Sequence, residues 1–239
     1  MQNTVVEMSV KSVPVRQIIS TRSEWIHTLG SDESLYIVPA VSRTYSNEHA
    51  YCDSAVLSAL GIATLDAEVL SLSHNLALKA GLVAWKESGG VPQQVMGWRL
   101  PKESADSRLF QVLPLSWLPR VSNREQFLEV LILDLWFRRS GKRQVIFRQT
   151  GREFEVIFLP SGDLVGTQKC TVQQVGYHQA AVYNELPWAR IEAGLKAKIA
   201  SLTLSDLGAR LRTLPEIDAR HRILKTLWFE TMVNKVCFD

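Results

Sequence analysis

The most chemically suggestive part of this sequence is a carboxylate within an apolar segment, followed by a group of basic residues. Segment 127–137 reads FLEVLILDLWF, and only Glu129 and Asp134 interrupt its apolar residues. A helix that is apolar on all sides is normally buried, and burying an unpaired carboxylate is costly. We therefore expect Asp134 to accept hydrogen bonds or to serve a site. The basic residues that follow are Arg138, Arg139, Lys142, Arg143 and Arg148.

The basic residues allow two interpretations. A flexible loop of this charge can neutralise the phosphates of a nucleotide or of an RNA backbone. We favour a solvated loop after the buried helix, because the dipole at a helix C-terminus attracts cations. Asp163 closes the sequence Pro-Ser-Gly-Asp at 160–163 and is either a displaced metal ligand or, as we favour, a turn residue.

The composition narrows the class of protein. The chain has 239 residues and a formal net charge of +3, which gives no reason to expect nucleic acid as a partner. This length can bury one good core or two small ones. Cys52, Cys170 and Cys237 form no CxxC pair, so we expect a protein of the reducing cytoplasm. We find no signal-peptide pattern and no apolar run of membrane-spanning length, so no membrane association is expected.

The first half of the chain has the pattern of a small sheet with one helix. Residues 13–19 and 36–41 are expected to be strands, with a polar turn at 30–33 between them. A helix is predicted over 47–60, opened by the capping residue Asn47 and ended by Gly61. Further strands are expected at 67–72 and 82–85, and residues 87–106 have the Gly, Pro and polar content of a loop.

The second half is predicted to be mainly helical. Residues 122–125, Ser-Asn-Arg-Glu, form a capping-box pattern before the buried helix at 127–137. Two strands, 144–148 and 154–159, alternate well enough to form a hairpin through Thr150 and Gly151. Three more helices are expected near 189–202, 205–214 and 216–237. The fold class is therefore α+β, with a sheet-and-helix part at 1–115 and a helical part carrying a hairpin at 116–239.

Four stretches in this order resemble the HipA-like kinase family, in its short bacterial type. Asn47-Glu48, with Ser-Ala-Leu-Gly-Ile at 58–62, is similar to the family's asparagine-glutamate helix and the step to its next strand. Asp-Leu-Trp at 134–136 resembles the aspartate-x-tryptophan that begins the catalytic segment. The hairpin region 144–166 stands where the family has its metal-binding strand. Leu-Pro-Glu at 214–216 resembles the step between the family's final helices.

The resemblance implies a bilobal, protein-kinase-like fold with a small N-terminal sheet lobe and a mainly helical C-terminal lobe. It also implies ATP and magnesium, because kinases act by positioning a nucleotide and its metal with a lysine, a catalytic aspartate and metal-binding asparagine and aspartate residues. This chain lacks these groups where the family pattern places them. The lysine position falls at Pro39, the catalytic aspartate at Gly141, and the metal ligands near Ile146 and at Phe158 or Leu159.

Three functions follow from these observations. The leading hypothesis is a pseudokinase, a HipA-like protein that needs no cofactor and acts by binding another protein, with Asp134 retained as a structural hydrogen-bonding residue. In that case Glu48 is solvated or pairs with a cation other than the kinase lysine. The second hypothesis is a divergent ATP- and magnesium-dependent kinase of the serine/threonine type. Its candidate residues are Glu48, Asp134, Lys142 and Asp163. The third is an unrelated α+β binding protein.

Overall fold

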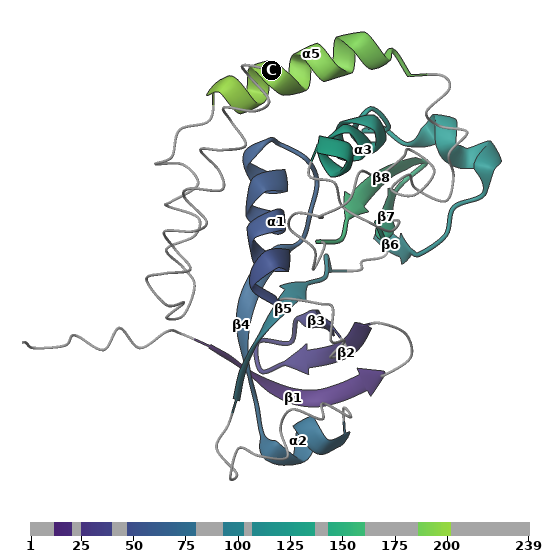
Figure 1. The fold of residues 1–239 in the computed structure, drawn as a ribbon. Helices are drawn as coiled ribbons and strands as arrows, with labels where there is room; N and C mark the ends of the chain where they lie inside the picture. Colours follow the sequence, from purple (N-terminus) through teal and green to yellow (C-terminus); the bar gives the residue numbers. More distant parts are fainter. Residues whose placement is uncertain are drawn as a thin grey trace, which may run out of the picture.

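The structure is a computed structural model with two β-sheets and several helices, whose buried apolar side chains form three clusters (Figure 1). It describes residues 12–20, 25–39, 47–79, 93–102, 107–136, 143–160 and 186–201. The predicted α+β class is confirmed for these residues. Within them, no helix is both long enough and apolar enough to cross a lipid bilayer.

Five strands close into a barrel. They are β1 (Val13–Ser20), β2 (Trp25–Gly30), β3 (Leu35–Pro39), β4 (Asp66–Leu72) and β5 (Gln93–Arg99). Their order is β1-β2-β3-β5-β4, and the barrel closes where β1 pairs in parallel with β4, all other pairs being antiparallel. Apolar side chains fill its interior, among them the buried Tyr36 and Leu70.

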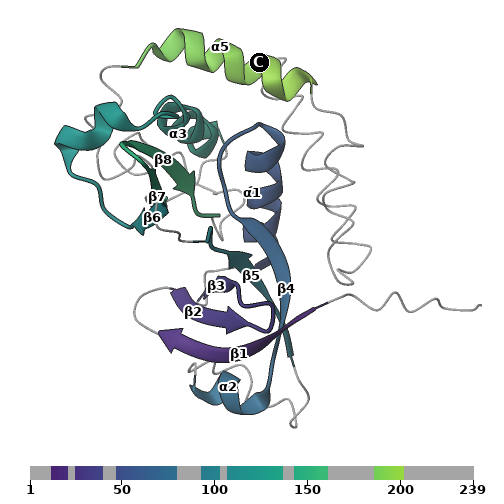
Figure 2. The same ribbon diagram turned by 180° about the vertical axis from the view of Figure 1, so that it is seen from behind.

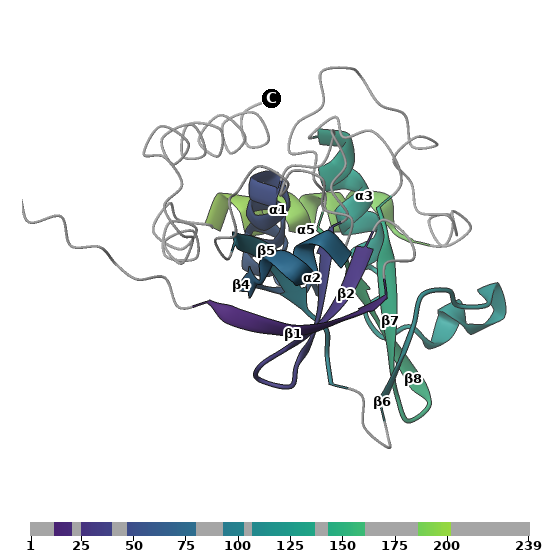
Figure 3. The ribbon, with the colours of Figure 1, turned by 90° about the horizontal axis from the view of Figure 1, so that it is seen from below.

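The other three strands form a separate antiparallel sheet to one side of the barrel (Figure 3). Strand β7 (Val145–Thr150) lies between β6 (Ser107–Phe110) and β8 (Glu153–Phe158). The hairpin predicted at 144–159 is therefore confirmed. Its turn contains Gly151 at a φ of 63°, a left-handed conformation that glycine adopts without steric cost.

The helices lie between and around these sheets. Helices α1 (Asn47–Ala59), α3 (Gln126–Trp136) and α5 (Trp188–Ser201) pack with the three-stranded sheet in one large apolar cluster. Helix α5 passes over one end of α1 and packs along the side of α3 (Figure 1, Figure 2), and the short α2 (His74–Lys79) lies at the far end of the barrel. A 3-10 helix, η2 (Leu115–Arg120), precedes α3.

Helix α1 ends as its sequence predicts. Gly61 has a φ of 73°, and its amide donates to the carbonyl of Ser58 at 3.1 Å while the amide of Ile62 donates to the carbonyl of Leu57 at 2.9 Å. This pair of bonds is the Schellman motif, in which a left-handed glycine lets the last helical carbonyls find donors. The helix predicted at 189–202 is also confirmed, as α5.

The loop predicted at 87–106 is wrong for part of its length, because β5 (Gln93–Arg99) is a central strand of the barrel. One of the glycines in this stretch, Gly97, has a packing role. A Cβ atom on Gly97 would lie 2.3 Å from Leu70 Cδ1, so only glycine fits against that buried side chain. Strand β2, which lies between the first two predicted strands, was not anticipated.

The predicted capping box before α3 is also wrong. The Ser122 hydroxyl donates to the carbonyl of Phe154 at 3.1 Å, and the Asn123 side chain exchanges two hydrogen bonds of 2.8 Å with the backbone of Val156. Ser122 therefore binds strand β8, and Asn123 binds both β8 and the side chain of Gln126 at the start of α3, through a hydrogen bond of 2.8 Å from its Nδ2 to Oε1. The strand expected at 82–85 and the helices expected at 205–214 and 216–237 lie outside the described residues.

Candidate functional site: a buried ionic cluster

Three charged side chains meet in the interior where α1, α3 and the β7–β8 hairpin converge. The guanidinium of Arg143 binds Asp134 through two nitrogens, with Nε to Oδ2 at 3.1 Å and Nη2 to Oδ1 at 2.6 Å. On its other side it forms an ion pair with Asp53 through Nη1. Nη1 also donates to the backbone carbonyl of Leu159 at 3.0 Å. We call Asp53, Asp134 and Arg143 the buried ionic cluster.

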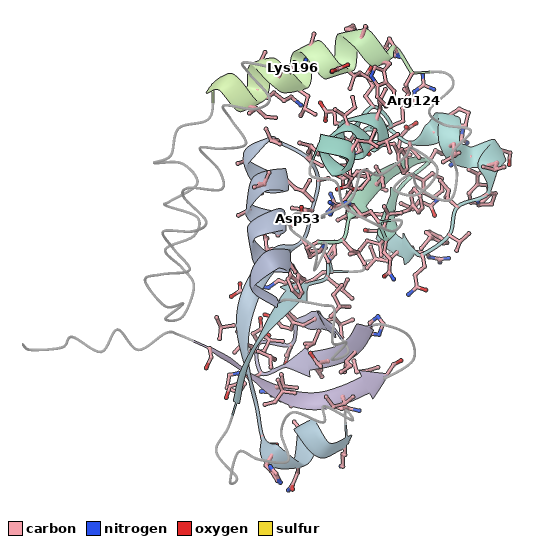
Figure 4. All side chains as sticks on the ribbon, viewed as in Figure 1. Asp53, Arg124 and Lys196 are labelled. Carbon is pink, nitrogen blue, oxygen red and sulfur yellow. The ribbon has the colours of Figure 1, made fainter. Side chains whose placement is uncertain are left out.

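Each member of the cluster comes from a different element. Asp53 lies on the side of α1 that faces the three-stranded sheet (Figure 4), and Asp134 is in the last turn of α3. Arg143 precedes β7 and Leu159 follows β8. The side chains of Asp53, Asp134 and Arg143 are 1%, 4% and 4% exposed. The cluster thus joins α1, α3 and the base of the hairpin, away from solvent.

The charges in this cluster stabilise one another. Burial lowers the pKa of Arg143, but the adjacent carboxylates of Asp134 and Asp53 outweigh that effect and raise its pKa above the usual range. The arginine therefore stays cationic. Because its nitrogens are committed to two carboxylates and a carbonyl, it is not a site for phosphate, and the solvated-loop interpretation is wrong for Arg143.

The prediction that Asp134 is an interior hydrogen-bonding residue is confirmed by this geometry. Asp53 was missed, although an aspartate in the middle of a helix with buried neighbours was a signal for a second interior charge. Arg148, another member of the basic group, is half-exposed and pairs with Glu155 across the hairpin. Arg138, Arg139 and Lys142 lie outside the described residues.

The positions that the family pattern assigns to metal ligands are apolar and buried. Ile146 is 7% exposed and Leu159 is 5% exposed. Both pack with Ile37 and Trp98 in the apolar cluster between the barrel and the three-stranded sheet. Among the described residues, no three His, Cys, Asp or Glu side chains are grouped so that they can hold a metal ion.

The structure describes only some of the other predicted site residues. Pro39 ends β3, opposite Trp25 of β2. Glu48 lies in the first turn of α1, but its side chain is outside the described part of the chain, so its predicted solvation or pairing stays a prediction. Gly141, Lys142 and Asp163 are outside it as well.

A second, partly exposed polar group lies at the turn between β2 and β3. Asp32 accepts hydrogen bonds from the Tyr36 hydroxyl at 2.8 Å and from the Ser34 amide at 3.2 Å, and Arg99 Nη2 lies 3.6 Å from it. Burial raises the pKa of Asp32, but these two hydrogen bonds and the Arg99 charge outweigh it and lower the pKa from 3.8. The same arrangement raises the pKa of Tyr36, mainly through burial and then through its bond to Asp32.

We expect Asp32→Asn to lower the free energy of unfolding at neutral pH. In acid, we expect the variant and the wild type to be equally stable. A carboxyl whose pKa is depressed by folding stabilises the folded state above its unfolded pKa, and this contribution disappears as the pH falls through the lower folded value. The difference in urea midpoint between the wild type and Asp32→Asn should therefore be largest near pH 7 and shrink below 3.8. A difference that does not change with pH would contradict the assignment. Glu153→Gln, on the exposed start of β8, is the control.

Comparisons with known proteins identify the fold. No protein-family model matches this sequence, and no curated protein matches it. Among solved structures, the chain resembles the Shewanella oneidensis MR-1 toxin–antitoxin system HipA, solved with HipB and operator DNA. The TM-score is 0.51 at 11% identity, over 96% of this chain and 66% of that chain. This chain therefore spans just under two thirds of the length of that chain.

A second solved structure is similar over most of its own length. It is the Helicobacter pylori proinflammatory kinase CtkA, with a TM-score of 0.50 and 8% identity over 89% of this chain and 86% of that chain. Identities this low establish a likeness of fold and not of activity. The chain has a HipA-like fold.

Proposed function

We propose that this chain is a HipA-like, kinase-fold protein without phosphotransfer activity. The observation that carries the proposal is the apolar, buried character of the two positions that the family pattern assigns to metal ligands. Ile146 and Leu159 are apolar, buried and packed against Ile37 and Trp98. Magnesium in kinases is held by oxygen ligands, chiefly carboxylates. An apolar core at these positions offers none.

The buried ionic cluster supports the same conclusion. The carboxylate of Asp134 begins the segment that resembles a catalytic one, yet both of its oxygens bind Arg143 in the interior. A group that orients a substrate hydroxyl must be within hydrogen-bond reach of that substrate. Asp134 instead holds the scaffold together. Pro39, at the lysine position, provides no charge for a phosphate.

The fold comparisons and the strand pairing favour two lobes. In this proposal the barrel with α1 is the N-terminal lobe, and the three-stranded sheet with α3 and α5 belongs to the C-terminal lobe. Strand β6 precedes the predicted boundary at residue 115 but pairs with β7, so the junction between the lobes lies in the linker between β5 and β6. The protein is proposed to act in the cytoplasm.

A titration with nucleotide tests the loss of activity. We expect neither binding heat nor thermal stabilisation with millimolar ATP, with or without magnesium. Magnesium-dependent ATP binding that is lost in Lys142→Ala or Asp163→Ala would instead establish the divergent kinase, with its groups relocated. Lys79→Ala, an exposed residue of α2 far from both positions in sequence, is the matched control. The HipA-like fold argues against the third hypothesis, an unrelated binding protein.

A protein partner is the proposed ligand, and η2 provides a surface for it. Val112, Leu115 and Trp117 are 76%, 58% and 39% exposed, and together we call them the η2 surface. The guanidinium of Arg120 lies 5.3 Å from the centre of the Trp117 ring and donates to the carbonyl of Arg152 at 2.8 Å. Val112, Leu115 and Trp117 lie close together in the chain, and exposed apolar patches are typical of interaction sites.

The charge of the chain segment that carries the η2 surface suggests the chemistry of the partner. Residues 107–124 contain three arginines and no acidic residue. Aliphatic side chains beside a tryptophan fit an apolar protein segment better than nucleic acid, which is bound mainly by cations and stacking. We therefore propose a partner segment that combines apolar and acidic side chains.

Labelled synthetic peptides test this surface. We expect a peptide of leucine and glutamate to bind, with weaker binding at high salt, and a peptide of leucine and lysine not to bind. The double variant Leu115→Ser/Trp117→Ser should lose the interaction. Trp188→Ser, which alters a tryptophan of similar exposure on α5, should retain it. Stronger binding of a single-stranded oligonucleotide, or no effect of the double variant, would contradict the proposal.

A further inference from the structure

A pocket of about 650 Å³ lies between the barrel and the β7–β8 hairpin. Its walls come from the β2–β3 turn, the start of β4, the linker after β5 and the hairpin. This volume is within the range of small-molecule sites, which often lie between two parts of a fold. Its described lining residues include none of the positions that the family pattern assigns to the nucleotide lysine or the metal. The pocket instead contains Asp32 and Arg99 of the polar group at the β2–β3 turn.

The lining combines charges of both signs with an apolar wall. Leu65 and Ile157, which are 3% and 4% exposed, belong to the apolar cluster between the two sheets and continue into the pocket beside Leu100. The charged lining residues are equal in number for each sign, so their formal charges cancel. They are Asp32, Asp66, Glu155, Arg99, Lys102 and Arg148.

This balance of charge argues against a polyphosphate ligand, which requires an excess of cations. Four of the six charged residues already take part in ion pairs, and Arg99 also pairs at 3.0 Å with Glu68, which does not line the pocket. Arg99 Nη2 lies 3.6 Å from the carboxylate of Asp32, and Arg148 forms an ion pair with Glu155.

The other two charged residues are Asp66 and Lys102, both exposed. Within the described part of the chain, neither takes part in an ion pair. Asp66 pairs in register with Arg99, and Lys102 follows Arg99 by three residues. Three residues span at most about 10 Å, so the two opposite charges come from neighbouring segments of the pocket wall.

We propose that this pocket binds a small zwitterion with an apolar side chain, of the free amino acid or dipeptide class. Asp66 receives the ammonium group, and Lys102 receives the carboxylate. The side chain of the ligand packs on Leu65, Leu100 and Ile157. This inference does not depend on whether the kinase-like site is inactive.

Calorimetry and thermal shift with matched ligands test the proposal. The probes are leucine, the dipeptide Leu-Leu, N-acetyl-leucine, leucinamide and N-acetyl-leucinamide, which carry both charges, only one charge or none. We expect leucine or Leu-Leu to bind at millimolar concentration, and each blocked form to bind at least about tenfold more weakly, because it loses one charge-assisted contact. The size of the preferred probe distinguishes a free amino acid from a dipeptide.

Two variants assign the contacts. Asp66→Asn should weaken the binding of the zwitterion at least about tenfold and leave the binding of N-acetyl-leucine unchanged. Lys102→Met should weaken the binding of the zwitterion and leave the binding of leucinamide unchanged. Both side chains are exposed, so both variants should keep the wild-type melting temperature. Lys79→Met and Glu153→Gln are controls on other surfaces. The proposal is overturned if no probe binds, if the fully blocked form binds equally well, or if AMP or ATP binds in place of the zwitterions.

Discussion

Replacing Arg143 with methionine is expected to lower the free energy of unfolding by about 3–5 kcal/mol, the cost typical of removing one partner from a buried ion pair. The substitution leaves Asp53 and Asp134 in the interior without their shared cation, and it removes the hydrogen bond to the carbonyl of Leu159. Urea denaturation at neutral pH measures the loss.

The matched control is Arg148→Met, because Arg148 also joins a carboxylate but its side chain is 40% exposed. Exposed pairs are worth at most about 1 kcal/mol. If Arg143→Met costs no more than Arg148→Met, the buried ionic cluster does not hold the elements together.

The same variant has a characteristic pH dependence. Buried carboxylates without a cation have raised pKa values, and a group whose pKa is raised by folding loses its stabilising contribution as the pH rises. Arg143→Met should therefore recover part of its deficit in mild acid. Adding Asp134→Asn to Arg143→Met should recover part of the loss at neutral pH by removing a buried charge.

The second large effect is expected at Phe127, where Phe127→Ala should cost about 3–5 kcal/mol, the range for deleting a buried phenylalanine. Its ring is 1% exposed and contacts two others, with centroids 6.3 Å from Phe147 and 5.6 Å from Phe158. The substitution opens a cavity between α3 and both strands of the hairpin. Chemical denaturation monitored by circular dichroism measures the change.

Trp188→Ala removes a larger aromatic ring and serves as the control. This side chain is 38% exposed, and surface substitutions usually change stability by about 0.5 kcal/mol or less. Equal losses for Phe127→Ala and Trp188→Ala would mean that the cluster around α3 is not the principal core.

The sequence predicted those helices and strands that depend mainly on residues next to one another in the chain. The hairpin at 144–159 has alternating residues and a glycine turn, and α1 has a glycine stop, so both are predictable from neighbouring residues. Strand β5 was not, because Gly97 is required by Leu70 of another strand. The same limit applies to the supposed capping box, since the hydroxyl of Ser122 donates to the carbonyl of Phe154 in β8.

The candidate site was predictable only in part for a similar reason. An apolar helix with one carboxylate predicts that Asp134 is buried and hydrogen-bonded, and it is. The identity of its partner depends on contacts across the fold, because Arg143 also bridges to Asp53, a residue 90 positions earlier in the chain. A basic residue in a charged loop gives no local sign that it will fold inward.

The bonds that Ser122 and Asn123 make to β8 also bear on association between copies of the chain. Open sheet edges are where strands of other molecules add and where aggregation begins, and the closed barrel has no such edge. The outer side of β8 is already occupied, since Phe154, Val156 and Phe158 bond to residues outside the sheet. In the described part of the chain, the other outer strand of this sheet is β6 (Ser107–Phe110), which is only four residues long.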